Sequence, residues 1–173
     1  IGSGKTTLLR VLLGLLPLDS GEILWNGEPV LQPASFFVPP HSAYTPQVPR
    51  LFSDSLRHNI LLGLSEAEVD LEGAVETAVL SPDIALLEKG LDTVVGPRGV
   101  RLSGGQVQRA AAARMLVRQA ELLVFDDLSS ALDVETEKQL WQKILGRQKA
   151  EGRMVPRVWW CRTGGWRYSR LTR

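Results

Sequence analysis

A glycine-rich run at the start of the chain constrains the fold more than any other feature. The run Gly2-Ser3-Gly4-Lys5-Thr6 matches the second half of the phosphate-loop pattern G-x-x-x-x-G-K-[ST]. Glycines let consecutive backbone N–H groups curl around phosphate oxygens, the following helix directs its positive dipole end at them, and lysine adds a full charge. A flexible turn is the alternative. The leucine-rich helix expected over residues 6–15 favours phosphate binding, with Thr6 as a ligand of Mg²⁺.

A second constraint is an apolar run that ends in two acids. Residues 122–125 (LLVF) are bounded by charge, as is typical of a buried parallel strand, and Asp126 and Asp127 follow them. Ligands gather at the carboxyl ends of strands in open α/β sheets. We therefore expect Asp126 to hold Mg²⁺ through water and Asp127 to act as a base toward the attacking water, as in a Walker B motif. On these residues alone, a strand that ends in solvent with two acids explains the pattern nearly as well.

The remaining pattern predicts more helices than strands. Leucine spacing and breakers place helices at residues 6–15, 54–62, 65–80, 81 onwards, 104–119 and 133–145. Their expected N-terminal caps are Ser53 or Asp54, Ser65 in a capping box with Glu68, Ser81 or Asp83, Ser103 and Asp133. A strand is expected at residues 21–25 before an Asn-Gly turn, and loops over residues 28–50, which carry six of the ten prolines.

Together these elements predict an α/β fold. We expect a P-loop NTPase (RecA-like) core of mostly parallel strands, with an α-helical subdomain inserted at about residues 51–119. The length of 173 residues and the 44% hydrophobic content suit one globular domain. The longest apolar stretch, Val11 to Leu16, is far shorter than the roughly 20 residues that span a bilayer. The chain begins with Ile1 inside a motif, so further sequence is expected upstream.

The run LSGGQ at residues 102–106, followed by Val107, Gln108 and Arg109, is the most specific motif. A serine and two glycines that open a helix form an anion site of the same kind as the phosphate loop, although a plain serine cap with a glycine turn would look similar. The run resembles the signature sequence of ABC ATPases and lies between the phosphate loop and the Walker B acids, as in that family. The stretch Ser129 to Asp133 resembles the family's D-loop.

The resemblance implies a composite ATP site. In the family, the signature of one subunit closes on the ATP held by the phosphate loop of another, so the working unit is a dimer. Gln47, in the run AYTPQ, resembles the Q-loop glutamine, which contacts Mg²⁺ and water. The residues expected to bind ATP are Gly2, Ser3, Gly4, Lys5, Thr6, Thr7, Leu102, Ser103, Gly104, Gly105, Gln106 and Asp133. Those expected to hold Mg²⁺ are Thr6, Gln47 and Asp126, and those expected in catalysis are Asp127 and Gln47.

Finer resemblance points to the exporter-like branch. Residues 51–60 resemble the family's stretch after the Q-loop, and residues 92–99 resemble the exporter segment before the signature, with Pro97 in place of the usual glutamate. Asp127 also replaces a usual glutamate. Because aspartate is one methylene shorter, the base is expected to work at a reduced rate. The two histidines, His41 and His58, do not occupy the family's catalytic position and are expected to be solvated or structural.

The branch implies partners and a location. These are a second nucleotide-binding domain, in a homo- or heterodimer, and transmembrane domains fused upstream, at the cytoplasmic face of the inner membrane. The body of the chain carries no basic stripe, so no nucleic-acid partner is expected. Two alternatives stay open: a soluble ABC-type ATPase that acts in DNA repair or on ribosomes, and an inactive remnant of a transporter gene.

The end of the chain departs from the family. Where the family has a strand and then a histidine that contacts the γ-phosphate, residues 157–173 contain three of the five tryptophans, five arginines and no acid. Because tryptophan has a single codon, the bases under Trp159 and Trp160 are nearly fixed, and a shifted frame permits the family's strand followed by Ser-His-Arg. We therefore predict an ABC domain at residues 1–156 and a frameshift-derived tail at residues 157–173. A basic arm that binds nucleic acid or membrane is the alternative.

Overall fold

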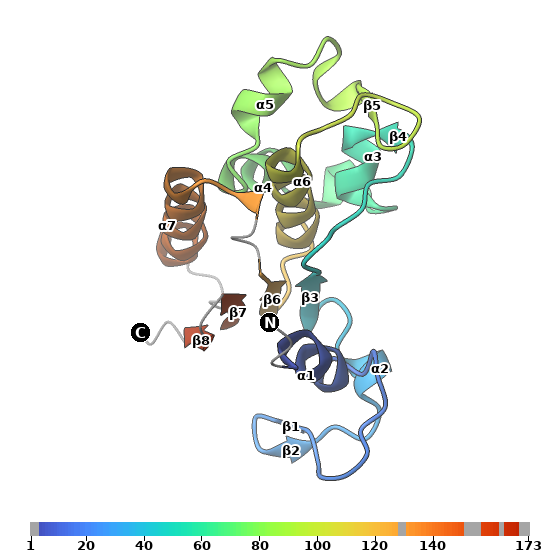
Figure 1. Cartoon of the computed structure of the whole chain (residues 1–173), viewed down its shortest axis with the longest axis vertical. Coiled ribbons are helices and arrows are strands. Elements are labelled where there is room, and N and C mark those ends of the chain that lie inside the picture. The colour runs from blue at the N-terminus through green and yellow to red at the C-terminus, as the bar shows by residue number, and fades with distance from the viewer. Residues whose placement is uncertain (1–3, 128–130, 151–156, 163–164, 170–173) are drawn as a thin grey trace.

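A central sheet organises the computed structural model, which describes residues 4–127, 131–150, 157–162 and 165–169. Its four strands are β3 (Ser42–Thr45), β6 (Leu122–Asp126), β7 (Arg157–Arg162) and β8 (Gly165–Ser169), in the order β3-β6-β7-β8. The first three are parallel, and β8 is antiparallel to β7. Figure 1 shows the strands nearly end-on, with helices α6 (Gly104–Leu116) and α7 (Val134–Ala150) on one face and α1 (Lys5–Leu12) on the other. The predicted α/β core is confirmed.

Strand β6 is buried along its whole length because both faces of the sheet are covered. Leu122 and Val124 pack against Leu9 and Leu13 at the α1 layer. The alternate residues, Leu123 and Phe125, belong to the larger core on the opposite face. Since successive side chains of a strand point to opposite faces, Asp126 shares the α1 face with Leu122 and Val124.

Strand β3 is a correction to the expected loop at residues 28–50. Residues 42–45 pair in parallel with residues 122–125, and Ser42, Ala43 and Thr45 are buried. The many prolines of this segment flank the strand rather than interrupt it, because Pro40 precedes it and Pro46 follows it. A short helix, α2 (Pro33–Phe36), was not expected either.

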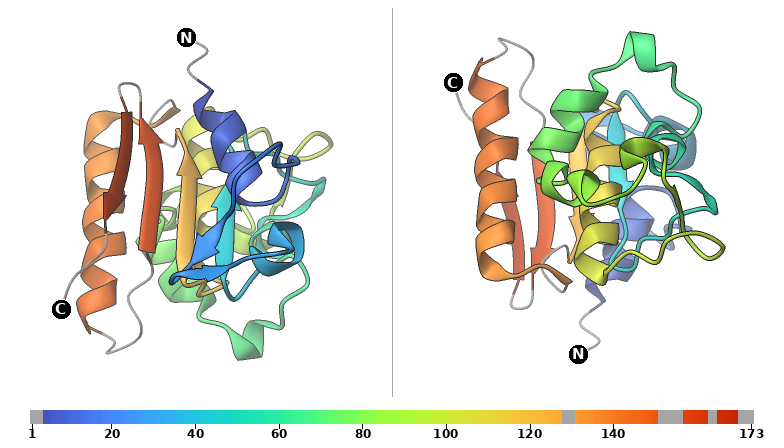
Figure 2. Two further views of the ribbon diagram at one scale, coloured as in Figure 1. Left: turned by 90° about the horizontal axis from the view of Figure 1, so that it is seen from below. Right: turned by 90° about the horizontal axis from the view of Figure 1, so that it is seen from above.

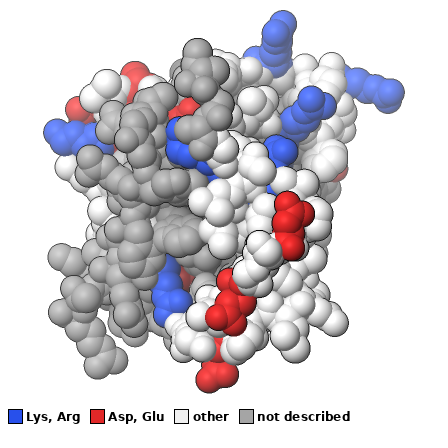
Figure 3. Space-filling view, turned by 60° about the horizontal axis from the view of Figure 1, so that its bottom comes forward, with Lys and Arg blue, Asp and Glu red and all other residues white. Residues whose placement is uncertain are grey.

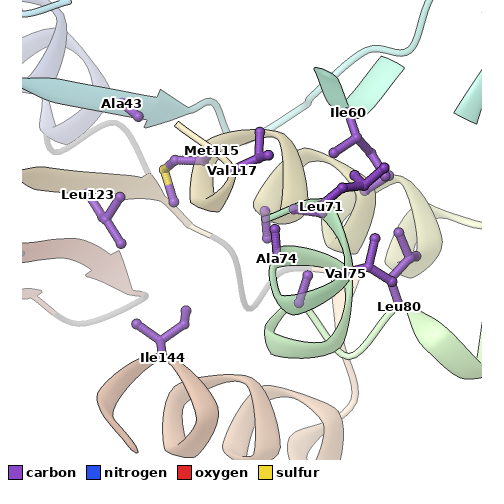
Figure 4. Packing of buried hydrophobic residues seen from close by; sticks show 14 of the residues in the cluster. Ala43, Ile60, Leu71, Ala74, Val75, Leu80, Met115, Val117, Leu123 and Ile144 are labelled. Atoms are coloured by element: carbon purple, nitrogen blue, oxygen red, sulfur yellow. The ribbon is translucent and has the colours of Figure 1, made fainter. Parts of the chain in front are cut away.

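Helices form the large core on the second face of the sheet. Buried side chains from α6, α7, α3 (Leu56–Leu61) and α4 (Leu71–Thr77) meet there, as Figure 4 shows for Ile60, Leu71, Met115 and Ile144. Helix α6 presents a run of four alanines at residues 110–113, all buried, and small side chains let its neighbours approach closely. Trp141 of α7 meets Phe125 of β6 edge to face, with 5.2 Å between ring centroids.

The segment between β3 and α6 contains α-helices near the three predicted positions, but they are shorter than predicted. It also contains the 3-10 turns Glu66–Glu68 and Gly90–Asp92, the helix α5 (Ser81–Ala85), and a small antiparallel pair of β4 (Asp54–Ser55) and β5 (Val94–Val95). Helix α3 is capped by Ser55, whose hydroxyl accepts a hydrogen bond from the His58 N–H. The capping box expected at Ser65 is wrong, because the chain becomes extended at Val69 and Asp70 caps α4 instead.

The N-terminal part forms a small layer beside α1. Strands β1 (Leu24–Trp25) and β2 (Glu28–Pro29) form a hairpin at the expected Asn26-Gly27 turn, and both turn residues have positive φ. Strand β1 is shorter than the strand expected at residues 21–25, and β2 lies in the segment expected to form loops. Figure 1 shows this hairpin on the side of α1 away from α7, and the left view of Figure 2, seen from below, shows it in front of the sheet. Helix α1 ends at Leu12, three residues earlier than expected, because Gly14 adopts a φ of +70°.

The described surface is largely uncharged on the face shown in Figure 3, and the charged side chains are scattered across it. Several leucines are exposed, among them Leu31 at 91% and Leu15 at 56%. Within the described ranges, no helix combines the length and the apolar character needed to cross a membrane. The domain boundary predicted at Pro156 lies outside the described residues, and the division of the chain there stays a prediction.

The end of α1 generates a stability prediction. A methyl group added at Gly14 would overlap the backbone of Pro33 and Ala34, whereas one added at Gly21, where φ is +94°, meets nothing within 4 Å. We expect Gly21→Ala to lower the free energy of unfolding by about 1 kcal/mol through backbone strain alone. Gly14→Ala should cost about 2 kcal/mol more, because strain and overlap add. Urea unfolding of both variants measures the difference, and equal losses would contradict the packing described for α1.

Candidate functional site

The site is built around Asp126 at the carboxyl end of β6. Its side chain is 2% exposed and points to the α1 layer. The Thr6 hydroxyl donates to Asp126 Oδ1 at 3.1 Å, and the Tyr44 hydroxyl lies 3.3 Å from Asp126 Oδ2 as the second donor. Burial, and then the nearby Asp126 charge, raise the pKa of Tyr44, so its hydroxyl keeps its proton at neutral pH. The sequence motifs predicted that Thr6 and Asp126 meet, and the structure brings them together.

The start of α1 provides the phosphate-binding end of the site. Gly4 precedes the helix with a φ of +70°, and no side-chain cap occupies this end in the described part of the chain. The first N–H groups of a helix have no acceptor within the helix, and its dipole favours an anion there. Lys5 and Thr6 are half-buried in the first turn, and Thr7 is exposed. Gly2 and Ser3 lie outside the described residues.

Gln47 and Asp127 form the second contact of the site. The exposed Gln47 lies beyond the end of β3, and its Nε2 donates to Asp127 Oδ2 at 3.2 Å. Gln108, in the second turn of α6, donates to the Gln47 backbone carbonyl at 2.7 Å. Asp127 has a φ of +54°, an uncommon conformation for a residue other than glycine, directly after β6. The two residues expected in catalysis therefore lie together beside the Thr6–Asp126 contact.

The signature residues open α6 as predicted. The Ser103 hydroxyl accepts from the Gln106 N–H at 3.3 Å, and Gln106 Oε1 accepts from the Ser103 N–H at 2.8 Å, which completes a capping box. A Cβ on Gly105 would lie 3.0 Å from the Ala131 carbonyl oxygen, so this glycine allows the segment after β6 to pack against the helix start. Gly104 is exposed, and Leu102 packs against the large core. Ser129, in the stretch that resembles the D-loop, lies outside the described residues.

A largely buried ion pair, which was not predicted from the sequence, links the first turns of α6 to α5. Arg109 donates to both oxygens of Asp83 in α5, at 2.7 to 2.9 Å, and the two side chains are only 13% and 15% exposed. Gln106 Nε2 donates to Asp83 Oδ1 at 3.1 Å. Asp83 was predicted only as the start of a short helix. No local pattern could have paired it with Arg109, because the two residues are 26 positions apart.

Asp133 acts as the N-cap of α7. Its carboxylate accepts hydrogen bonds from the N–H and the hydroxyl of Thr136, at 2.9 and 2.7 Å. These hydrogen bonds lower the pKa of Asp133. The cap confirms the predicted start of this helix, while the part of Asp133 in nucleotide binding stays a prediction.

The donors around Asp126 suit a magnesium ion. Carboxylate, hydroxyl and amide oxygens are hard ligands, and Mg²⁺ usually combines one or two protein carboxylates with substrate phosphates and water. Asp126, Thr6 and Gln47 supply such oxygens at the edge of the sheet. The described residues contain no group of three or more histidine, cysteine or acidic side chains that could enclose a metal alone. The residues therefore fit an ion that is shared with a phosphate ligand.

The buried pair at the signature generates a second prediction. Asp83→Ala leaves the largely buried Arg109 without its carboxylate and should cost about 3 kcal/mol of the free energy of unfolding. Asp92→Ala is the matched control, because it also removes an arginine partner, that of Arg57, but Asp92 is 67% exposed and the loss should be small. Denaturant unfolding compares the two variants. Similar losses would contradict a special role of the Asp83–Arg109 pair.

Comparison with known proteins agrees with this geometry. The sequence model of the ABC transporter family matches residues 1–130. A probable multidrug resistance ABC transporter ATP-binding/permease protein of Bacillus subtilis is 38% identical over 151 residues, which is 87% of this chain and 26% of the relative. An ATP-dependent lipid A-core flippase of Photobacterium profundum is 39% identical over 150 residues, 86% of this chain and 26% of the relative.

A solved structure shows the same relationship. The chain superimposes on a bacterial Atm1-family ABC exporter with ATP bound, with a TM-score of 0.76 and 33% identity, over 91% of this chain and 27% of that one. The chain thus spans about a quarter of the length of these relatives. It belongs to the ABC transporter family and corresponds to the ATP-binding domain of the exporter-type members.

Proposed function

We propose that the chain binds ATP with Mg²⁺ and hydrolyses it as half of a dimeric site that drives an exporter. The observation that carries this proposal is the 3.1 Å contact between Thr6 and Asp126, which joins the phosphate loop to the acidic end of β6. The loop residues Gly2, Ser3, Gly4, Lys5, Thr6 and Thr7 bind the phosphates. Thr6, Asp126 and Gln47 hold Mg²⁺, which when bound neutralises charge on the terminal phosphates.

Asp127 is the proposed base. The oxygen of a water molecule attacks the γ-phosphorus, and one proton of that water passes to the Asp127 carboxylate. The bond between the γ-phosphorus and the bridging oxygen breaks, which releases ADP and phosphate. The Gln47 side chain, which donates to Asp127 Oδ2, orients that carboxylate. Because aspartate is shorter than the glutamate usual in the family, the water must lie closer to the strand or reach the base through a second water. A slow hydrolytic step follows.

The second half of the site comes from another subunit. The phosphate loop and the signature of one chain are held by different neighbours: Thr6 by Asp126, and Gln106 by Asp83. The helix that Ser103 opens is a second anion-binding end. In a two-fold dimer each copy offers Leu102, Ser103, Gly104, Gly105 and Gln106, with Asp133, to the ATP on its partner.

The whole protein is proposed to be larger than this chain. The similar proteins are named as ATP-binding/permease proteins, a flippase and exporters. By analogy, transmembrane domains fused upstream receive the work of ATP hydrolysis, and the cassette lies at the cytoplasmic face of the inner membrane. This similarity favours a transporter over a soluble ABC-type ATPase.

An inactive remnant is the second candidate, and the histidines favour it. The sequence has two histidines, and both are engaged away from the site: His41 stacks on Phe36, with ring centroids 4.3 Å apart, and His58 lies 3.0 Å from Asp54. Neither reaches the γ-phosphate position of the family. A shifted reading frame from about Arg157 would account for the missing histidine. Genomic DNA across Pro156 tests this: a one-base shift should encode Ser-His-Arg, and DNA that permits it in no frame would contradict the frameshift.

The base generates the main functional prediction. In the intact protein, Asp127→Asn should lower ATP turnover by at least about 100-fold and leave ATP binding intact, because it removes only the proton acceptor. Lys5→Ala is the contrasting control, since it should weaken binding itself by removing a phosphate-directed charge. Phosphate release and fluorescent-nucleotide binding measure the two effects. Unchanged turnover in Asp127→Asn would overturn the assigned base, and a wild-type protein that binds no nucleotide would favour the remnant.

A further inference from the structure

Tyr44 occupies a position of the site that no motif assigns. It lies on β3 in register with Val124 of β6, and it packs with the small core at α1. From there its hydroxyl reaches diagonally along the sheet to Asp126 Oδ2 at 3.3 Å. The other oxygen, Oδ1, accepts from Thr6 at 3.1 Å. Each oxygen of this buried carboxylate therefore has its own hydroxyl donor.

The two donors differ in what nucleotide binding requires of them. Under the proposed function the Thr6 hydroxyl oxygen also faces the metal while its hydrogen can still donate to Oδ1. Because Thr6 belongs to the phosphate loop, the position of this bond depends on how the loop holds the nucleotide. Tyr44 lies on the neighbouring strand, outside the phosphate loop, and can keep its bond to Oδ2 throughout. The terminal torsion of an aspartate is broad, so a carboxylate held at only one oxygen can rotate about that contact. With Asp126 2% exposed, bulk water is a poor substitute for the lost donor.

We propose that Tyr44 is a positioning residue for the metal–nucleotide site, holding Asp126 Oδ2 so that Oδ1 stays directed at the Thr6 position. The inference rests on the proposed function, because it assigns Tyr44 a part in the same Mg²⁺ site. Loss of the Tyr44 hydroxyl should therefore weaken metal binding and leave the binding of metal-free ATP unchanged. Residues that orient a metal ligand from behind typically change metal affinity by tenfold or more.

The test removes one oxygen atom. Tyr44→Phe keeps the ring that packs on the small core of Leu9 and Val124 and deletes only the hydroxyl, which donates to Asp126 and also contacts Arg10 of α1. Ser42→Ala is the matched control: it deletes another hydroxyl from the same strand, one that donates to the Phe37 carbonyl at 2.7 Å rather than to the site. All proteins carry Asp127→Asn, so that bound ATP is not consumed.

Two quantities are measured on the intact protein. ATP affinity is determined with Mn²⁺ and again in EDTA. Mn²⁺ affinity in the presence of ATP is determined from the loss of the free Mn²⁺ signal in electron paramagnetic resonance. Tyr44→Phe should bind metal-free ATP as tightly as its parent and Mn²⁺ about tenfold more weakly. Ser42→Ala should match the parent in both measurements.

Four results would overturn the inference. Mn²⁺ affinity could be unchanged in Tyr44→Phe. ATP affinity could fall equally with and without metal, or Ser42→Ala could show the same loss, and either would make the role of Tyr44 merely structural. A parent protein whose ATP binding does not depend on metal would overturn the proposed magnesium site, and with it this role. This last result tests the proposed function separately from the role of Tyr44, because it is measured on the parent protein, in which Tyr44 is unchanged.

Discussion

The hydrogen bond between Thr6 and Asp126 joins residues 120 positions apart, and the arrangement of the site depends on it. It forms only if β6 is buried between its neighbours with residues 122, 124 and 126 turned toward α1. A shift of one residue in the register of β6 would turn Asp126 to the opposite face, into the helical core, and bring Asp127 toward α1. The packing of Leu9 and Leu13 on Leu122 and Val124 therefore fixes the face of the sheet on which Asp126 lies. The same packing thus stabilises the fold and places Asp126 beside Thr6.

Helix α6 connects this centre to the second anion-binding end. Its alanine run packs in the core, while its polar side chains hold functional segments in place. Gln108 fixes the Gln47 backbone, and Arg109, with Gln106, ties the signature to Asp83. One rigid helix thus positions Gln47, which faces Asp127 in the same chain, and Ser103, which is proposed to face ATP on another. A movement of α6 relative to the sheet would alter both contacts together.

Features that depend on residues close together in the sequence could be predicted, whereas contacts between residues far apart in the sequence could not. The Ser103 and Asp133 caps are local and were predicted correctly, as was the buried strand that ends in two acids. Strand β3 was missed because its four residues carry little pattern of their own and are stabilised by pairing with β6. The Ser65 capping box failed because Asp70 offered a better cap five residues later. The Asp83–Arg109 pair and the reach of Tyr44 to Asp126 depend on tertiary packing and strand register, which no local motif encodes.

The most direct test of the composite site is an ATP-bound structure of the intact protein that carries Asp127→Asn. Two ATP molecules per dimer are expected, each with its phosphates at the start of α1 beside Lys5 and Thr6 of one copy. Ser103 and Gly105 of the other copy should approach the γ-phosphate. ATP held entirely within one copy, or bound away from Thr6 and Asp126, would contradict the composite site.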